Sequence, residues 1–163
     1  MNNLEGFYYW LEELPLTLLI GGTWLFPLLE SLHVIGAVLV FGAIVMADLR
    51  LLGVIGSSYS TRSFVQELVP WSVGGFVLAL ITGLGMFVTR ASGYAHNSAF
   101  LWKMALLLLA AINIIYFHRW VFPRLLNIGN DSGMLASAKL SGGCSLLLWL
   151  GVMLAGRWTG HLI

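Results

Sequence analysis

The run FPLLESLHVIGAVLVFGAIVMADLR, from Phe26 to Arg50, limits this chain more than any other stretch. It is long enough to cross a bilayer, whose hydrocarbon core needs about 20 apolar residues in a helix. Yet Glu30 and His33 lie inside one end of the run, and Asp48 and Arg50 close the other. An ionisable side chain at membrane depth is costly unless it faces protein, water or a ligand. The sequence therefore predicts an integral membrane protein with a polar feature inside its first span.

The composition agrees with this prediction. The chain has 163 residues, of which 59% are hydrophobic and 9% charged, whereas soluble domains carry about 25% charged residues. Its formal net charge of +1 argues against a nucleic-acid partner, which would require a basic patch. We expect a single integral membrane domain, residues 1–163, in contact with the lipid bilayer.

Apolar runs predict four spans, at about residues 27–49, 69–90, 100–121 and 140–160. Breaker-rich segments separate them, and the last of these runs from Pro123 to Gly133. Short connections between antiparallel neighbours favour an all-α, up-down-up-down four-helix bundle. The preceding segment, residues 3–25, mixes aromatic and acidic residues and is interrupted by prolines and glycines, so we expect an N-terminal interfacial helix.

Basic residues predict the orientation. The ends and loops after spans one and three hold five of them, and the opposite side holds three. Since basic residues concentrate in cytoplasmic loops, both termini are predicted to lie outside the cytoplasm of a bacterial inner membrane. The five are Arg50, Arg62, Arg119, Arg124 and Lys139, and the three are Arg90, Lys103 and Arg157.

A helical wheel divides span one into two faces. Branched aliphatic residues take one face, and small or polar residues take the other, which is typical of a lipid-facing and a bundle-facing surface. The inward face holds Glu30, His33, Gly36, Ala37, Val40, Ala43, Ala47 and Asp48.

Other polar and small residues have expected roles in packing. Span two carries a close-packing stripe of Gly75, Ala79 and Gly83. Asn113 is expected to donate to a neighbouring helix, and Lys103 to snorkel to the outer boundary. Asp48 and Arg50 are expected to orient the inner end of span one.

The four histidines raise the possibility of haem b, which membrane bundles hold through imidazole nitrogens. His33 lies about 9 Å below the outer boundary and His118 about 5 Å inside the inner one, at about 1.5 Å per residue. The two heights differ by about 16 Å in a core about 30 Å thick. One iron cannot join this pair, so His118 needs a separate partner.

An outer cluster of His33, His96 and His161 is the alternative metal or cofactor site, with Arg157 placed to pair with Glu30 or with an acidic group of a ligand. His33 is also placed to meet its own copy across a two-fold axis. Solvation of His96, and interfacial anchoring of His118 and His161, are the competing interpretations.

Motifs of stand-alone catalysis are missing from the sequence. It has no Walker loop, no HExxH and no CxxC. It also has no CxxCH, which excludes covalently attached haem. Whether the chain is an enzyme stays open, and a place in a larger redox complex is compatible with its residues.

Several segments carry a family resemblance: LHVIGAVLVFGAIVMADLRLLG, VPWSVGGFVLALITGLGMF, NSAFLWKMALLLLAAIN and AGRW. Over nearly its whole length the chain resembles a family of small four-helix bacterial membrane proteins of unassigned function. It is distantly similar to copper-resistance D membrane domains and to b-type cytochrome bundles. By that resemblance the family's polar positions match His33, Asp48, Arg50, Lys103, Asn113 and Arg157.

Three functional hypotheses follow. The leading one is a small membrane subunit that binds haem b or quinone and takes part in electron transfer, with His33, Glu30, His118 and Arg157 as cofactor-binding residues. The second is a non-catalytic accessory subunit that packs against other membrane subunits or its own copies. The third is copper or proton handling at the outer face, in which His33, His161 and His96 are the metal-binding residues.

Overall fold

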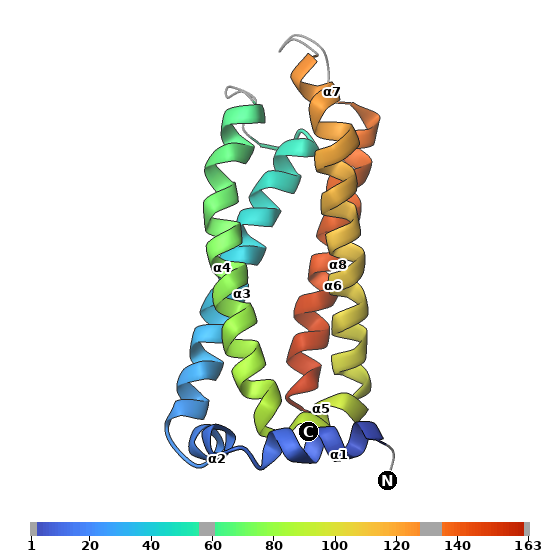
Figure 1. Ribbon diagram of the computed structural model, residues 1–163. Helices are drawn as coiled ribbons and strands as arrows, with labels where there is room; N and C mark the ends of the chain where they lie inside the picture. Colours follow the sequence, from blue (N-terminus) through green and yellow to red (C-terminus); the bar gives the residue numbers. More distant parts are fainter. Residues whose placement is uncertain (1–2, 56–60, 128–134, 162–163) are drawn as a thin grey trace.

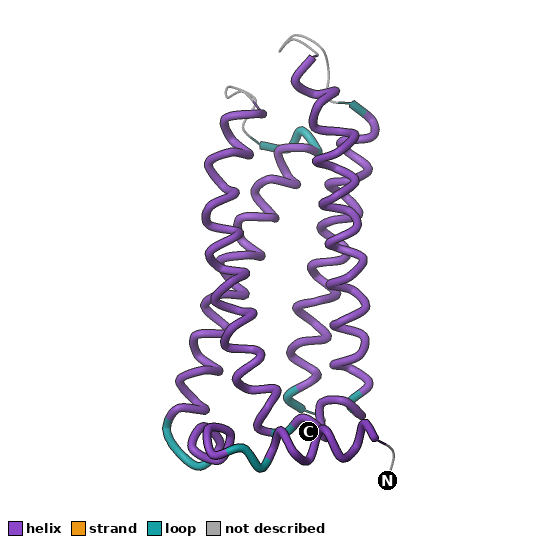
Figure 2. The backbone as a smooth tube through the Cα atoms, in the orientation of Figure 1, coloured by secondary structure: helices purple, strands orange, loops and turns teal. Residues whose placement is uncertain are grey.

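The computed structural model describes residues 3–55, 61–127 and 135–161. Within them, four long helices pack as an antiparallel bundle (Figure 1): α3 (Leu25–Leu51), α4 (Thr61–Thr89), α6 (Ser98–Tyr116) and α8 (Ala136–Thr159). Each contributes a segment long and apolar enough to cross a membrane, which confirms the four predicted spans. Figure 2 shows that short connections join the helices.

Short helices cover one end of the bundle, which we call the terminal end. There α1 (Asn3–Glu12) and α2 (Pro15–Gly21) lie across the bundle axis, beside α5 (Ala91–His96) and the last turn of α8 (Figure 1). The Glu12 carboxylate accepts hydrogen bonds from the Ser92 backbone N–H at 2.8 Å and from its hydroxyl at 2.6 Å. These bonds attach α1 to α5. The short N-terminal helices are therefore confirmed, and their position at a membrane surface stays a prediction.

The helices α3 and α4 form the first of two pairs. A Cβ added at Gly36 would lie 2.8 Å from the carbonyl oxygen of Gly75 and 2.8 Å from the backbone nitrogen of Ala79. No side chain larger than hydrogen fits at such a distance, so the two backbones touch directly at these positions. The predicted stripe of small residues on span two is thus the surface that packs against α3.

The helices α6 and α8 form the second pair. The Asn113 amide donates to the Ser141 carbonyl at 3.1 Å, and the Ser141 hydroxyl donates to the Asn113 oxygen, also at 3.1 Å. The predicted donation from Asn113 to a neighbouring helix is confirmed. Leu106 of α6 packs against Gly151 of α8, where an added Cβ would lie 3.0 Å from a leucine methyl group.

The two pairs meet where α3 passes α8. A Cβ at Gly142 would lie 3.3 Å from the Asp48 carbonyl oxygen, so the helices approach closely near the far end, opposite the terminal end. Farther down the bundle, a cluster of buried residues continues the contact: Val40, Ala110, Trp149 and Val152. These contacts fix how the two pairs sit relative to each other.

The third span is longer than the sequence indicated. The expected loop beginning at Pro123 is wrong, because the chain stays helical through a π turn (Phe117–Val121, η1) and then α7 (Phe122–Asn127). In a regular α-helix a proline ring collides with the carbonyl four residues earlier, here that of Arg119. That carbonyl lies in the wider π turn, a geometry that often marks functional sites.

Candidate functional site

A cavity of about 620 Å³ lies between the two helix pairs, in the half of the bundle nearer the far end. Its floor consists of buried residues of α3 and α8, including Val40, Ala43 and Trp149. Its rim includes Val73 of α4 and Ile115 of α6, whose side chains are 56% and 61% exposed. The cavity therefore opens sideways between α4 and α6, on the surface that a membrane-spanning bundle presents to lipid.

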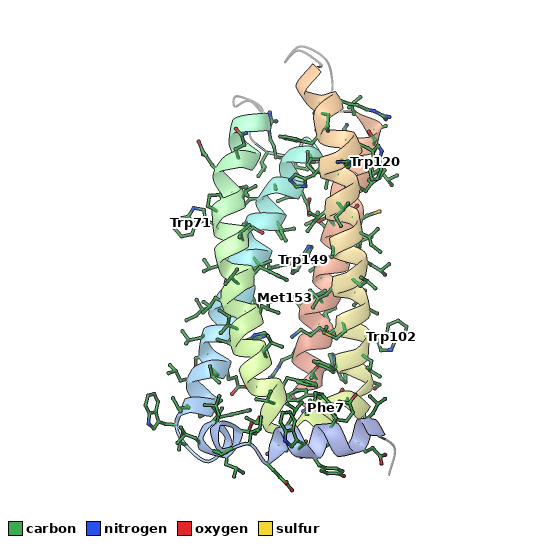
Figure 3. The ribbon with its side chains drawn as sticks, viewed as in Figure 1. Phe7, Trp71, Trp102, Trp120, Trp149 and Met153 are labelled. Atoms are coloured by element: carbon green, nitrogen blue, oxygen red, sulfur yellow. The ribbon has the colours of Figure 1, made fainter. Side chains whose placement is uncertain are left out.

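Two polar side chains on the cavity floor lack a hydrogen-bond partner. Asp48 is 5% exposed and its Oδ2 is buried without one; Trp149 is 7% exposed and its Nε1 is buried without one. Both residues line the cavity, and Figure 3 shows Trp149 between the helix pairs while Trp71 and Trp102 point outward. Because buried polar atoms in proteins are almost always paired, an acceptor and a donor left open on one cavity wall indicate a ligand.

Further polar groups surround the Asp48 carboxylate. The Ser145 side chain lies next to it on α8, and Ser72, Asn113 and Ser141 also line the cavity. The Asn113 and Ser141 side chains already bond to each other. The cavity is thus mostly apolar with a few convergent polar groups, the character of small-molecule sites.

His118 lies in the π turn and lines the same cavity. Its Nδ1–H donates to the Ile114 carbonyl at 3.0 Å, so Nε2 is the nitrogen left to accept. The imidazole is exposed. Of the residues predicted to bind a cofactor, His118 is therefore the one that the structure places at this cavity.

His33 belongs to a second polar cluster, nearer the terminal end. Its Nδ1 lies 2.8 Å from the Ala79 carbonyl oxygen and 3.3 Å from the Thr82 hydroxyl oxygen. The Thr82 hydroxyl donates its own hydrogen to the Leu78 carbonyl at 2.6 Å, so both neighbours of Nδ1 act as acceptors. His33 therefore carries its hydrogen on Nδ1. Gly83 makes room for the ring, since a Cβ there would lie 3.1 Å from the imidazole Cε1.

Lys103 completes this second cluster. Its Nζ lies 3.4 Å from the Nε2 of His33, which is left to accept. The expectation that Lys103 snorkels to the boundary is wrong, because its side chain turns into the bundle instead. Gly156 of α8 permits this path: a Cβ there would come within 3.8 Å of the lysine Nζ.

The remaining predicted residues lie on the surface near the terminal end. Glu30, His96, Arg157 and His161 are all exposed, and the His96 ring donates to the Ser92 carbonyl at 2.8 Å. Glu30 was expected to face inward; instead its charge acts on Tyr94 of α5. Burial raises the pKa of Tyr94, Arg90 opposes that rise, and the negative charge of Glu30 adds to it.

The structure does not bring the predicted metal-binding residues together. Among the residues it describes, no three His, Cys, Asp or Glu side chains converge as a metal ion requires. His33 and His118 also lie toward opposite ends of the bundle, on the third turn of α3 and beyond the last turn of α6. The outer histidine cluster stays a prediction.

These features define the chain as a multi-pass, four-helix membrane protein with two internal polar sites. Residues 8–162 match a family of unknown function (DUF6644), and the chain belongs to that family. No curated protein and no solved structure matches it. The distant likeness to copper-resistance D domains and to b-type cytochromes therefore stays a prediction.

Three residues of these sites were missed or misassigned from the sequence. Asp48 shares the inward face of its helix with His33, and that position was the available signal for a buried site. Lys103 carried a weaker signal, since it shares a helix face with the inward Asn113. Trp149 carried none, because a tryptophan in an apolar run is equally typical of a lipid-facing position.

Proposed function

We propose that this protein binds a quinone, a lipid-soluble redox carrier, in the lateral cavity and takes part in electron transfer as a membrane subunit. The observation that carries the proposal is the pair of open hydrogen-bonding groups, Asp48 Oδ2 and Trp149 Nε1, inside an otherwise apolar cavity. The lateral opening also favours a ligand that arrives from the bilayer, because the rim lies between α4 and α6.

Quinone chemistry matches these groups. A quinone presents a flat ring with two carbonyl acceptors on an apolar tail, and its reduction takes up electrons and protons. The Trp149 N–H is placed to donate to a ring carbonyl, and the Asp48 carboxyl group is placed to hold a proton beside the ring. A cavity of about 620 Å³ falls within the range of about 300–1,000 Å³ usual for small-molecule sites.

Haem b fits the described residues less well. The Nδ1–H of His33 donates to a backbone carbonyl, as ligating histidines do. However, the Lys103 Nζ lies 3.4 Å from Nε2, on the side where an iron would bind. Haem at His33 therefore requires Lys103 to leave. This version predicts a Soret band in the purified protein that is lost in His33→Ala, and a colourless preparation would contradict it.

Electron transfer at a quinone site needs a second redox centre. We propose that another membrane subunit supplies it, which joins the leading hypothesis to that of an accessory subunit. The exposed aromatic side chains of α1, with Phe7 50% and Trp10 56% exposed, support a contact surface at the terminal end.

A binding titration tests the quinone proposal. The purified protein in lipid nanodiscs is titrated with a short-chain ubiquinone or menaquinone analogue, and the quenching of tryptophan fluorescence is recorded. Ser72→Phe places a ring at the cavity rim on α4 and should weaken binding at least tenfold. Val77→Phe is the matched control, because Val77 is on the same helix, is 47% exposed and does not line the cavity. Equal affinity in the two variants, or none in the wild type, would contradict the proposal.

A further inference from the structure

The His33–Lys103 contact joins the two helix pairs at a level where their backbones stay apart. His33 lies on α3, which packs against α4, and Lys103 lies on α6, which packs against α8. The α3 and α6 backbones do not pack against each other. The two long side chains therefore cross the space between the pairs, and their 3.4 Å hydrogen bond is the link.

The hydrogen count of this link is fixed by the neighbouring groups. The Nδ1 hydrogen of His33 is used by the Ala79 carbonyl and the Thr82 oxygen. What remains is the Nε2 of His33 opposite the Nζ of Lys103. Two nitrogens at this distance form a hydrogen bond when one proton lies between them. If Nε2 and a charged Lys103 are both protonated, two donors and two positive charges face each other.

No anion compensates this charge. Thr82 faces the imidazole from α4 and is neutral, and Gly156 lies beside Lys103 on α8. The nearest charged groups on the other elements, Glu30 of α3, Arg90 at the start of α5 and Arg157 of α8, are exposed. Among the charged groups described, it is Lys103 whose charge acts on His33.

We propose that His33 and Lys103 form an internal proton-binding site, which holds one proton between Nε2 and Nζ and breaks the link between the helix pairs when it takes up a second. The site is separate from the quinone cavity, and the proposal does not depend on that function. Its ligand is the proton. Thr82 and Ala79 are positioning groups, since they keep the imidazole in the form whose Nε2 accepts.

The stability of the protein as a function of pH tests this site. In nanodiscs, the thermal midpoint of the wild type should fall between pH 8 and pH 5 by at least about 4 °C, since a change of about 1 kcal/mol moves the midpoint of a chain this long by about 2–4 °C. The sign follows from the charges: acid adds the second proton, which the folded pair opposes and the separated side chains accept freely. Lys103→Met keeps the length of the side chain and removes its charge, so its midpoint should stay constant over this range.

Controls separate this site from the exposed histidines. His161→Gln and His96→Gln should retain the wild-type pH dependence, whereas His33→Gln should lose it. The same pH dependence in wild type, Lys103→Met and His33→Gln would overturn the proposal. If these variants fail to fold, nitrogen NMR of ¹⁵N-histidine-labelled wild-type protein decides instead. A protonated Nδ1 on His33 at neutral pH is expected, and an unprotonated Nδ1 would overturn the proposal.

Discussion

Two adjacent glycines of α4 should respond in opposite directions to the same substitution. A Cβ added at Gly75 would lie 2.9 Å from the Gly36 carbonyl oxygen, 2.9 Å from the Leu39 Cβ and 3.0 Å from the Val40 nitrogen. A Cβ added at Gly74 meets nothing within 4 Å. Alanine at position 75 must therefore push α3 away from α4, whereas alanine at position 74 extends into open space.

The distances give the size of the effect. Carbon atoms pack best at about 3.5–4.0 Å, so Gly75→Ala requires a separation of about 0.6–1.0 Å, which removes about a quarter to a half of the dispersion energy of the contacts it opens. Overpacking of this kind costs about 1–3 kcal/mol. Both variants gain the same helix propensity, up to about 1 kcal/mol. That gain cancels in the comparison, so Gly75→Ala should be less stable than Gly74→Ala by about 1–3 kcal/mol.

Equilibrium unfolding in mixed micelles, followed by far-UV circular dichroism, measures the difference. Gly74→Ala should equal or exceed the wild type in its free energy of unfolding, and Gly75→Ala should fall below it. If both variants unfold at the same denaturant fraction, the backbone contact between α3 and α4 is not the one described, and the positions of His33 and Asp48 on α3 lose their basis.

Two further substitutions probe the cavity and the terminal end. Trp149→Phe removes the open N–H and should weaken binding of the quinone analogue about 2- to 13-fold, the loss of one hydrogen bond of about 0.5–1.5 kcal/mol, while Trp102→Phe, on the outer surface, should leave the dissociation constant unchanged. Asn97→Ala removes a side chain that accepts from the backbone N–H groups of Ala99 and Phe100 and donates to the Thr159 carbonyl. It should lower the free energy of unfolding by at least about 1 kcal/mol, and Asn97→Asp, which keeps the cap but not the donation, should lower it less.

The fold was largely predictable because the solvent dictates it. A bilayer admits only fully hydrogen-bonded helices in a chain of this kind, so apolar length alone located the four spans. The inward face of α3 was predictable for the same reason: Gly36, Val40, Ala43 and Asp48 are buried, and Val34, Ile35 and Val38 are exposed. Periodicity separates lipid-facing from protein-facing positions wherever a helix has one of each.

The candidate sites were less predictable, because they depend on which helices touch. Glu30 shares the inward face with His33 on a wheel, yet it is exposed, since α3 at that level lacks a neighbour on that side. Lys103 turns inward because Gly156 leaves space on α8, a pairing that separate spans do not reveal. The cavity itself results from two helix pairs that meet mainly through α3 and α8, and the sequence contains no signal for that arrangement.

The extension of the third span also follows from local geometry that composition hides. Proline usually ends a helix, and Pro123 was therefore expected to begin a loop. The π turn before it changes where the carbonyl of Arg119 lies, and the helix continues to Asn127. The same turn holds His118 at the cavity, so an irregularity of the backbone places the histidine there.

The quinone content of the purified protein tests the central claim most directly. The protein is isolated from its native membrane in a mild detergent, the bound lipids are extracted, and quinone is quantified against protein by chromatography with absorbance detection. The cavity predicts close to one quinone per chain in the wild type and in Val77→Phe, and a loss of most of it in Ser72→Phe. Quinone at the level of the bulk lipid in all three preparations would contradict the assignment of this cavity as a quinone site.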